Sequence, residues 1–309
     1  MQPFFLITIK HLSTAKDVVP RGTQPMKGDK QYLKLKDYSV SGESFELLYD
    51  ASRELLYTHP NPPQSKLSNY YPNTNYISHT NQRNSLFDLL YHAVRYVSVH
   101  RKLRLLKPHQ PKQGTLLDIG AGTGFFLRAA KKRGWTVMGI EPNLSARTLA
   151  NLKTPNTVFE AETLQTLPEK SFNVITLWHV LEHLPNLEED VKTIQKLLKP
   201  NGRIVVAVPN FKSFDAEYFK NFWAAYDVPR HLWHFSQNSI SKVFSKVQME
   251  SESTLPLVMD AYYVSLLSNK LKTGSYRILN SLWVGFLSNL KALKSGEYSS
   301  LIYVLKNKN

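Results

Sequence analysis

Hydrophobic and polar positions form a regular alternation of strand-like and helix-like runs between residues 115 and 250. Short apolar runs bounded by turn residues are typical of strands buried on both faces of a parallel sheet. Strands that alternate with helices at this spacing favour a doubly wound α/β fold. The predicted strands are 115–119, 135–141, 157–161, 172–180 and 203–210, and the predicted helices are 123–133, 143–152 and 186–198.

The pattern changes after residue 250. Two further strands are predicted in "QMESESTLPLV" and "SSLIYVLKN", with helices over about 260–273 and 276–294 between them. Together with the earlier five strands they complete a Rossmann-like, doubly wound seven-stranded sheet. The pair of helices is therefore expected to be a late helical insertion, about 260–294, in that sheet.

The first part of the chain lacks this alternation. Prolines, Asn, Ser and Tyr interrupt residues 1–80, and only "YLKLKDYSV" and "SFELLYD" are expected to be short strands. Apolar residues with helical spacing then predict a helix over 84–106, which Pro108 ends. We expect an N-terminal cap region over 1–110 and a larger domain over 111–309.

Composition excludes several classes of protein. The chain has 309 residues and no cysteine, so disulfides and thiolate zinc sites are excluded. Its apolar runs fall short of the roughly 20 residues that cross a bilayer. The start, "MQPFFLITIKHLS", lacks the basic residues and cleavage pattern of a signal peptide. We expect a cytoplasmic protein without a membrane span; the sequence does not fix its oligomeric state.

The net charge is +15. Residues 1–114 carry 16 Lys and Arg against 8 Asp and Glu, whereas residues 115–250 carry 16 against 13. The densest basic run is "HRKLRLLKPHQPK", residues 100–112. It has two interpretations, a surface for anionic partners such as RNA or a solvated helix end, and the lack of interleaved aromatics favours the second.

The stretch "LLDIGAGTG" predicts a ligand site. Three glycines follow a buried strand, where backbone can turn sharply and a ligand can approach it closely. A phosphate-binding Walker loop needs a lysine that is absent here, and the third glycine comes one residue too early for a dinucleotide fingerprint. Glu141, 21 positions after Gly120, is placed to accept from both ribose hydroxyls. The motif therefore indicates a nucleoside without a pyrophosphate.

Four blocks now share one order and spacing: "LLDIGAGTG", "VMGIEPN", "FNVITLWHVLEHL" and "LLKPNGRIVVAVPN". Over about residues 113–250 they resemble a class I S-adenosylmethionine-dependent methyltransferase. A further segment, "YDVPRHLWHFS", resembles a "D-x-P-R-H-L-x-H-F-S" stretch in a bacterial branch of these enzymes acting on small molecules or glycans. The resemblance implies that residues 111–309 form the methyltransferase domain. It also implies S-adenosylmethionine as cofactor and methyl transfer to an O, N or C atom of a small molecule or glycan precursor.

The resemblance assigns roles along the strand ends. Asp118 and the glycine turn would hold the methionine part of the cofactor, and Glu141 its ribose. Pro142 would flank the adenine, and Glu160 or Glu162, of which we choose Glu162, would accept from its amino group. Trp178 has two interpretations, lining the sulfonium or filling the core. The implied cofactor-binding residues are Asp118, Gly120, Ala121, Gly122, Gly124, Glu141, Pro142, Glu162 and Trp178.

Three histidines are candidates for catalysis. His179 follows the fourth strand and would face the substrate, while His231 and His234 lie in the dense polar and aromatic segment 222–236. Histidine titrates near neutral pH and suits a general base. The alternative is that Asp227 and Arg230 pair to shape this segment, with its histidines bonded to the backbone. Methyl transfer does not itself require a base, because alignment can supply most of the catalysis.

Glu182 and His183, in "HVLEH", have two interpretations: they start a helix, or they lie beside the substrate, as a similar segment does in some small-molecule O-methyltransferases of this class, sometimes with a metal. We expect no metal site, because two adjacent residues without a third or fourth ligand do not make one. The segment "ELLYTHPNPPQSKLSNYYPNTNYISH" resembles one that precedes the catalytic domain in related bacterial enzymes. Some of these begin with a cysteine-rich zinc module, whose cysteines this chain lacks. Tyr70, Tyr71, Tyr76 and His79 would either cap the site or pack an ordered loop.

Three rival hypotheses accompany this interpretation. The basic charge favours an RNA methyltransferase as the second choice behind a small-molecule or glycan substrate. A cofactor-binding protein without catalysis is the third, and Asp118, Glu141 and Trp178 argue against it. A dehydrogenase is the fourth, and the early third glycine argues against it.

Overall fold

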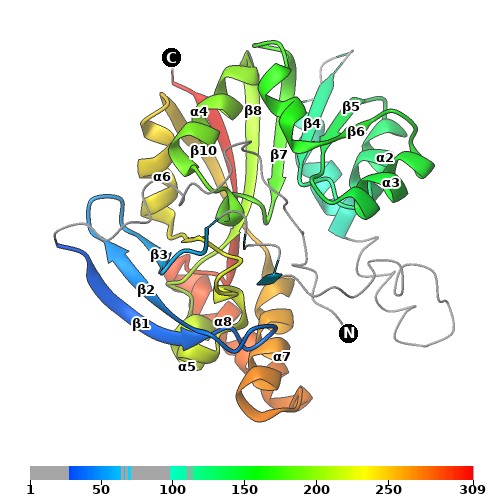
Figure 1. The fold of residues 1–309 in the computed structure, drawn as a ribbon. Coiled ribbons are helices and arrows are strands. Elements are labelled where there is room, and N and C mark those ends of the chain that lie inside the picture. The colour runs from blue at the N-terminus through cyan, green and yellow to red at the C-terminus, as the bar shows by residue number, and fades with distance from the viewer. Residues whose placement is uncertain are drawn as a thin grey trace, which may run out of the picture.

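The structure is a computed structural model that describes residues 28–63, 66, 69, 70, 98–109, 112 and 114–308. A seven-stranded sheet has the order β10-β11-β8-β7-β4-β5-β6 (Figure 1). Its strands β4 to β8 are parallel, whereas β11 runs antiparallel to both β8 and β10. The bounds are β4 (Thr115–Ile119), β5 (Thr136–Ile140), β6 (Val158–Phe159), β7 (Phe172–Trp178), β8 (Leu198–Pro209), β10 (Met249–Pro256) and β11 (Ser300–Asn307).

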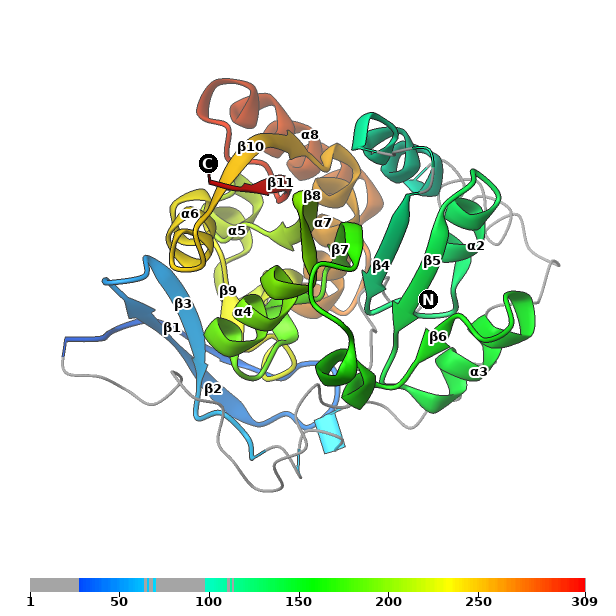
Figure 2. The same ribbon diagram turned by 90° about the horizontal axis from the view of Figure 1, so that it is seen from above.

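Helices cover both faces of this sheet. Figure 2 shows α2 and α3 beside β5 and β6, while α4 and α6 lie at the other end of the sheet. A short helical stretch, residues 98–106, also packs on the sheet through Leu103 and Leu106. The bounds are α2 (Phe125–Lys131), α3 (Leu144–Lys153), α4 (Leu187–Leu197) and α6 (Gln237–Ser245).

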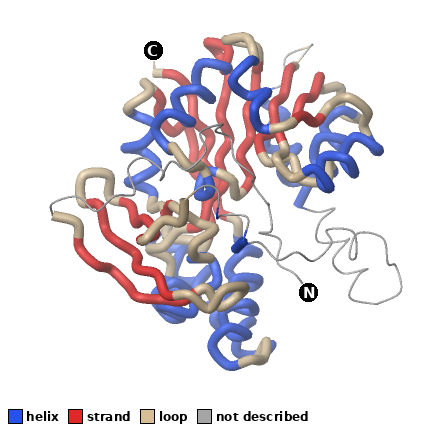
Figure 3. The backbone as a smooth tube through the Cα atoms, viewed as in Figure 1, coloured by secondary structure: helices blue, strands red, loops and turns tan. Residues whose placement is uncertain are grey.

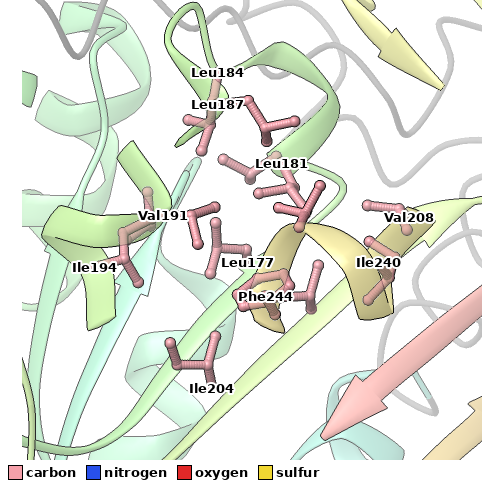
Figure 4. Close-up of a cluster of buried hydrophobic side chains, with 14 of the residues drawn as sticks. Leu177, Leu181, Leu184, Leu187, Val191, Ile194, Ile204, Val208, Ile240 and Phe244 are labelled. Carbon is pink, nitrogen blue, oxygen red and sulfur yellow. The ribbon is translucent and has the colours of Figure 1, made fainter. Parts of the chain in front are cut away.

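Successive residues of β8 point into different cores, as the continuous apolar run predicts. Ile204 and Val206 belong to the cluster under α4 and α6, whereas Val205 and Ala207 belong to the cluster on the opposite face. Figure 4 shows the first cluster, where side chains from the sheet and both helices converge. Its labelled members are Leu177, Leu181, Leu184, Leu187, Val191, Ile194, Ile204, Val208, Ile240 and Phe244.

A second body lies at the carboxyl ends of the parallel strands. It contains a four-stranded antiparallel sheet, β1-β2-β3-β9, and three helices (Figures 1 and 3). Leu47 of the small sheet, Phe219, Val264 and Val284 share one buried cluster, so the sheet and the helices pack together. The bounds are β1 (Lys30–Lys36), β2 (Ser44–Asp50), β3 (Leu55–His59), β9 (Trp233–His234), α5 (Phe214–Phe219), α7 (Val258–Thr273) and α8 (Ile278–Ser295).

Short 3-10 helices carry several of the strand-end loops. They lie after β6, β7 and α5, and two of them, η5 and η6, come before the buried segment that leads to β9. These loops bring the polar side chains of the site to one edge of the large sheet. Their bounds are η2 (Lys107–His109), η3 (Ala161–Thr166), η4 (Leu181–His183), η5 (Lys220–Phe222) and η6 (Ala224–Tyr226).

The predicted fold class is confirmed. The seven strands, the late helical pair and the two N-terminal strands all form, whereas β3 and β9 were not predicted. The "KPNG" turn differs from expectation because it lies inside β8, at the irregularity between Leu198 and Arg203 in its pairing with β7. Most of the predicted helix 84–106, and Tyr71, Tyr76 and His79, lie outside the described residues. The boundary at residue 110 stays a prediction. Among the described helices, none is long and apolar enough to span a membrane.

Candidate active site

The glycine turn links β4 to α2. Gly120, Gly122 and Gly124 all have positive φ angles, of 75°, 54° and 72°. A Cβ on Gly120 would lie 2.5 Å from Val180 Cγ2, so packing as well as backbone conformation favours glycine there. A Cβ on Gly122 would meet no atom within 4 Å. The turn is therefore tight against the sheet at Gly120 and open at Gly122, where a ligand has room.

Glu141 lies immediately after β5 and is 1% exposed. One carboxylate oxygen accepts the N–H of Gly122 at 2.8 Å and the other accepts the N–H of Asn143 at 2.9 Å. Burial raises the pKa of Glu141 to about 7, although both N–H groups oppose the shift. The carboxylate is thus fixed beside the open part of the turn, and each oxygen retains a lone pair for a further donor.

Asp118 lies on β4 one residue before its end, and Lys102 approaches it from helix 98–106. The Thr176 hydroxyl donates to Asp118 at 2.5 Å. Burial raises the pKa of Asp118, and the charge of Lys102 opposes this shift. Burial likewise lowers the pKa of Lys102, and the charge of Asp118 opposes it. A buried carboxyl and a buried amine therefore share the start of the glycine turn.

The remaining predicted cofactor residues differ in burial. Ala121 is buried in the turn, and its N–H donates to the Ile140 carbonyl at 3.0 Å. The Pro142 carbonyl accepts from Arg147 at 3.2 Å, next to Glu141. Glu162 is exposed in the first turn of η3. Glu160, the other candidate, is also exposed and lies 3.8 Å from Arg147.

Trp178 ends β7 and is 6% exposed. Its ring packs edge to face with Phe126 of α2 at 5.7 Å, and the Lys102 ammonium lies 4.3 Å from the ring centroid. The indole Nε1 has no hydrogen-bond partner within the part of the chain that the structure describes. Trp178 therefore fills core space and also presents its face to a cation at the head of the glycine turn.

His179 connects β7 to η4 with a left-handed backbone, φ 57°. Its Nε2 lies 3.3 Å from Asp260 of α7, and its Nδ1 lies 3.5 Å from Glu182 of η4. Burial lowers the pKa of His179, but the two carboxylates outweigh burial and raise the pKa to about 9. The side chain stays 16% exposed, which leaves it accessible at the carboxyl end of the sheet.

Asp227 and Arg230 organise the segment between η6 and β9. The Arg230 guanidinium lies 2.6 Å from Asp227 and 3.1 Å from Asp37, and it donates to the Tyr70 carbonyl at 2.8 Å. The charge of Arg230 outweighs burial and lowers the pKa of Asp227. This pairing is the alternative that the sequence left open, and it joins the segment to the N-terminal strands.

The other histidines of the region are deeply buried. His231 contacts the Ala225 carbonyl through Nδ1 at 2.8 Å, and His234 Nε2 lies 3.1 Å from the Thr58 hydroxyl. His183 contacts the Arg230 carbonyl through Nδ1 at 2.9 Å. Burial lowers the pKa of His183 to about 4 and that of His234 well below its usual range. Of the three predicted catalytic histidines, only His179 retains substantial exposure.

The fold brings most of the predicted residues to one edge of the sheet and adds residues that the sequence did not reveal. Asp118, the glycine turn, Glu141, Trp178 and His179 all lie at carboxyl ends of parallel strands. Lys102 and Asp260 were missed. Lys102 lies in the basic run, but its spacing with Leu103 and Leu106 places it on the buried face of its helix. Asp260 comes from the inserted helix, and no local pattern marks it.

Comparisons with known proteins identify the family of this chain. A family model described as a methyltransferase domain matches residues 90–253, more than half of the chain. An uncharacterized methyltransferase of Alkaliphilus oremlandii is 35% identical over 106 residues, which cover 33% of this chain and 49% of the relative. A ubiquinone biosynthesis O-methyltransferase of Agrobacterium fabrum is 33% identical over 111 residues, covering 34% and 44%. The chain thus spans about half the length of these curated relatives.

The solved structures that align with this chain share little of its sequence. Geranyl diphosphate C-methyltransferase from Streptomyces coelicolor aligns with a TM-score of 0.47 and 16% identity, over 67% of this chain and 75% of that one.

Proposed function

The chain belongs to the methyltransferase-domain family, whose methyl donor is S-adenosylmethionine, and from this premise we propose that it methylates a small molecule or a glycan precursor. The acceptor atom is O, N or C. The observation that carries the proposal is the buried Glu141 carboxylate, which is bonded to the open glycine of the turn at 2.8 Å. A buried carboxyl with a perturbed pKa in a turn with room for a ligand is typical of a binding site.

Glu141 would accept the two ribose hydroxyls of the cofactor. Each carboxylate oxygen already accepts one backbone N–H, which orients it without using both lone pairs. Hydrogen bonds between hydroxyls and a charged acceptor are stronger than neutral ones. The position of Gly122 beside the same carboxylate would let the nucleoside lie against the backbone of the turn.

Asp118 and Lys102 would bind the methionine part. This part of the cofactor carries an ammonium and a carboxylate, so a site with one carboxyl and one amine matches both charges. The two side chains influence each other's pKa in the free protein, which indicates that they face the same space. The ammonium of the ligand would pair with Asp118, and its carboxylate would pair with Lys102.

The acceptor would bind beside Trp178 and His179. Trp178 would place the face of its ring near the sulfonium. In the free protein the Lys102 ammonium approaches the same ring face. His179 pairs through both ring nitrogens with Asp260 and Glu182, so its exposed ring edge would pack against the acceptor and help to align the nucleophilic atom with the S–CH3 bond. When bound, S-adenosylmethionine would supply the methyl group: an electron pair of the acceptor would form the bond to the methyl carbon as the S–CH3 bond breaks with its electrons staying on sulfur, and the acceptor's proton would pass to solvent.

Calorimetry with S-adenosylhomocysteine tests the cofactor site. We expect Glu141→Ala to weaken binding roughly 10- to 100-fold, the loss of hydrogen bonds to a charged group. Glu169→Ala removes an exposed carboxylate and serves as the matched control, with unchanged affinity. NAD should not bind. Unchanged affinity in folded Glu141→Ala would contradict the ribose assignment.

The acceptor class is tested by transfer of a labelled methyl group into a fractionated cell lysate, followed by mass spectrometry. We expect label in the fraction of small molecules or glycan precursors. His179→Ala should slow transfer at saturating cofactor without changing cofactor affinity. Cofactor that binds but labels no fraction would support the non-catalytic alternative instead.

A further inference from the structure

Three side chains, none of which was assigned a contact with the cofactor or the acceptor, converge next to the acceptor side of the site. Glu182 and His183 come from η4, and His231 comes from the segment between η6 and β9. All three are buried, and one oxygen or nitrogen of each lies within 4.8 Å of the others. The two imidazole rings meet edge to face at a centroid distance of 4.6 Å. The sequence shows only two adjacent candidate ligands here, and folding supplies the third.

Hydrogen bonds fix which ring nitrogens face the cluster. His183 Nδ1 lies 2.9 Å from the Arg230 carbonyl, and His231 Nδ1 lies 2.8 Å from the Ala225 carbonyl. A carbonyl only accepts, so each Nδ1 carries a proton and each neutral ring has its lone pair on Nε2. Histidines that bind metal typically donate their other N–H to a carbonyl or carboxylate in this way.

The cluster contains acceptors without matching donors. In the described part of the chain, His183 Nε2 and Glu182 Oε2 have no hydrogen-bond partner. Glu182 Oε1 lies 3.5 Å from His179 Nδ1. Buried polar atoms are nearly always paired, and lone pairs that face one another repel. A cation among them would satisfy the lone pairs of His183 and Glu182 together.

The ligands are also held in place by the backbone. The Leu232 N–H donates to the Glu182 carbonyl at 2.8 Å, and the Trp233 indole donates to the Leu184 carbonyl at 2.7 Å. These bonds fasten η4 to the segment that carries His231. Bonds of roughly 2.0–2.2 Å to a single ion would draw the three ligand atoms closer together than their present separation of up to 4.8 Å.

We propose that Glu182, His183 and His231 form a binding site for a divalent metal ion with a preference for nitrogen ligands, such as Zn²⁺. Two imidazoles and one carboxylate match the ligands of zinc sites that keep one open position. The hard ion Mg²⁺ prefers oxygen ligands and should bind weakly. The proposed metal site does not depend on which acceptor is methylated. Its ligand Glu182 also contacts His179.

The test is zinc binding to the full chain, purified without a histidine tag and stripped with a chelator. Calorimetry and metal analysis should give one Zn²⁺ per chain and much weaker binding of Mg²⁺. Glu182→Gln and His183→Gln should each weaken Zn²⁺ binding by at least about tenfold. His234→Gln is the matched control, because His234 is a buried histidine of the same segment that contacts Thr58 instead.

A wild-type chain that binds no Zn²⁺ overturns the proposal, as does binding that Glu182→Gln and His183→Gln leave unchanged, which would indicate surface histidines. Cobalt substitution of the wild-type chain covers the case in which the variants do not fold. We expect the intense visible bands of a four- or five-coordinate Co²⁺ site, whereas the weak spectrum of hydrated Co²⁺ would refute the site. Binding of S-adenosylhomocysteine, measured in the same samples, reports separately on the proposed cofactor site.

Discussion

At the scale of single residues, Glu141 links burial to ligand binding. Burial raises its pKa in the free protein to about 7, whereas ribose hydroxyls donate best to the charged carboxylate. Below about pH 7, therefore, the Glu141 carboxyl must lose a proton before it binds the ribose. We expect S-adenosylhomocysteine to bind roughly tenfold more weakly at pH 6 than at pH 8, since each pH unit below the pKa reduces the ionised fraction about tenfold. Calorimetry across this range measures the change.

Glu141→Gln provides the control for this pH dependence. Its amide retains the acceptor oxygen but does not ionise, so the affinity should vary less with pH. Asp118 leaves a residual slope of the same sign, because burial raises the pKa of Asp118 as well. An affinity that falls with rising pH, or a slope that the amide variant fully retains, would contradict the assignment of Glu141 to the ribose.

Residue roles could be predicted from the sequence only where they lie in contiguous blocks. Asp118, Glu141 and the three glycines occupy fixed positions relative to strand ends, and strands are visible as apolar runs. Lys102 and Asp260 come from helices outside those blocks, and their side chains meet the site only after packing. The convergence of His231 on Glu182 and His183 joins positions far apart in the chain, which no local spacing encodes.

At the scale of elements, strong periodicity explains what could be predicted. Burial determines the sequence patterns of three elements: the amphipathic helix α4 and the continuous apolar strands β7 and β8. These elements could therefore be predicted from the sequence. Two-residue β9 could not be predicted, because Trp233 and His234 become a strand only by pairing with β3 at Tyr57 and Leu56. The predicted boundary was wrong for the same reason at "KPNG", because Leu198 pairs with Phe172 of β7 and β8 therefore begins before the expected turn.

Helix α4 carries a buried acid whose charge opposes folding. Asp190, in its first turn, is 4% exposed and accepts the Asn186 N–H at 3.1 Å. Burial raises its pKa to about 7, well above the value of 3.8 in an unfolded chain. The folded state therefore binds this proton more tightly, so its contribution to stability is complete below pH 4 and is lost as pH rises through 7.

Asp190→Asn should remove that loss while retaining the acceptor for Asn186. At pH 8 we expect the variant to gain roughly 1–3 kcal/mol in free energy of unfolding, and at pH 4 little or nothing. Urea denaturation at both pH values measures the difference. Glu169→Gln, a change at an exposed carboxylate that does not affect the pKa of Asp190, should have little effect. Equal gains at both pH values would show that packing, not ionisation, is responsible.

At the scale of the whole molecule, one basic groove among the described residues is separated from the candidate active site. A groove of about 480 Å³ is lined by Arg101, Arg104 and His109, with Glu252 on its other side. Glu252 pairs with Arg203, which lies early in the parallel pairing of β8 with β7. The glycine turn instead follows the end of β4. The groove therefore lies toward the amino-terminal ends of the parallel strands, away from their carboxyl ends. Its charged side chains do not surround the proposed acceptor side.

This separation yields a prediction that distinguishes a small-molecule acceptor from RNA. Contacts with phosphates would make binding fall steeply with salt, with a slope of about −0.7 per contact for a single strand. Methyl transfer to a compact acceptor at the buried end of β7 involves few such contacts. We expect the rate of transfer to the labelled small-molecule fraction to change less than about twofold between 50 and 200 mM salt. Total RNA added as acceptor should take up no label under the same conditions. Labelled RNA, together with a rate that falls at least tenfold over that range, would instead assign the basic groove to an RNA substrate.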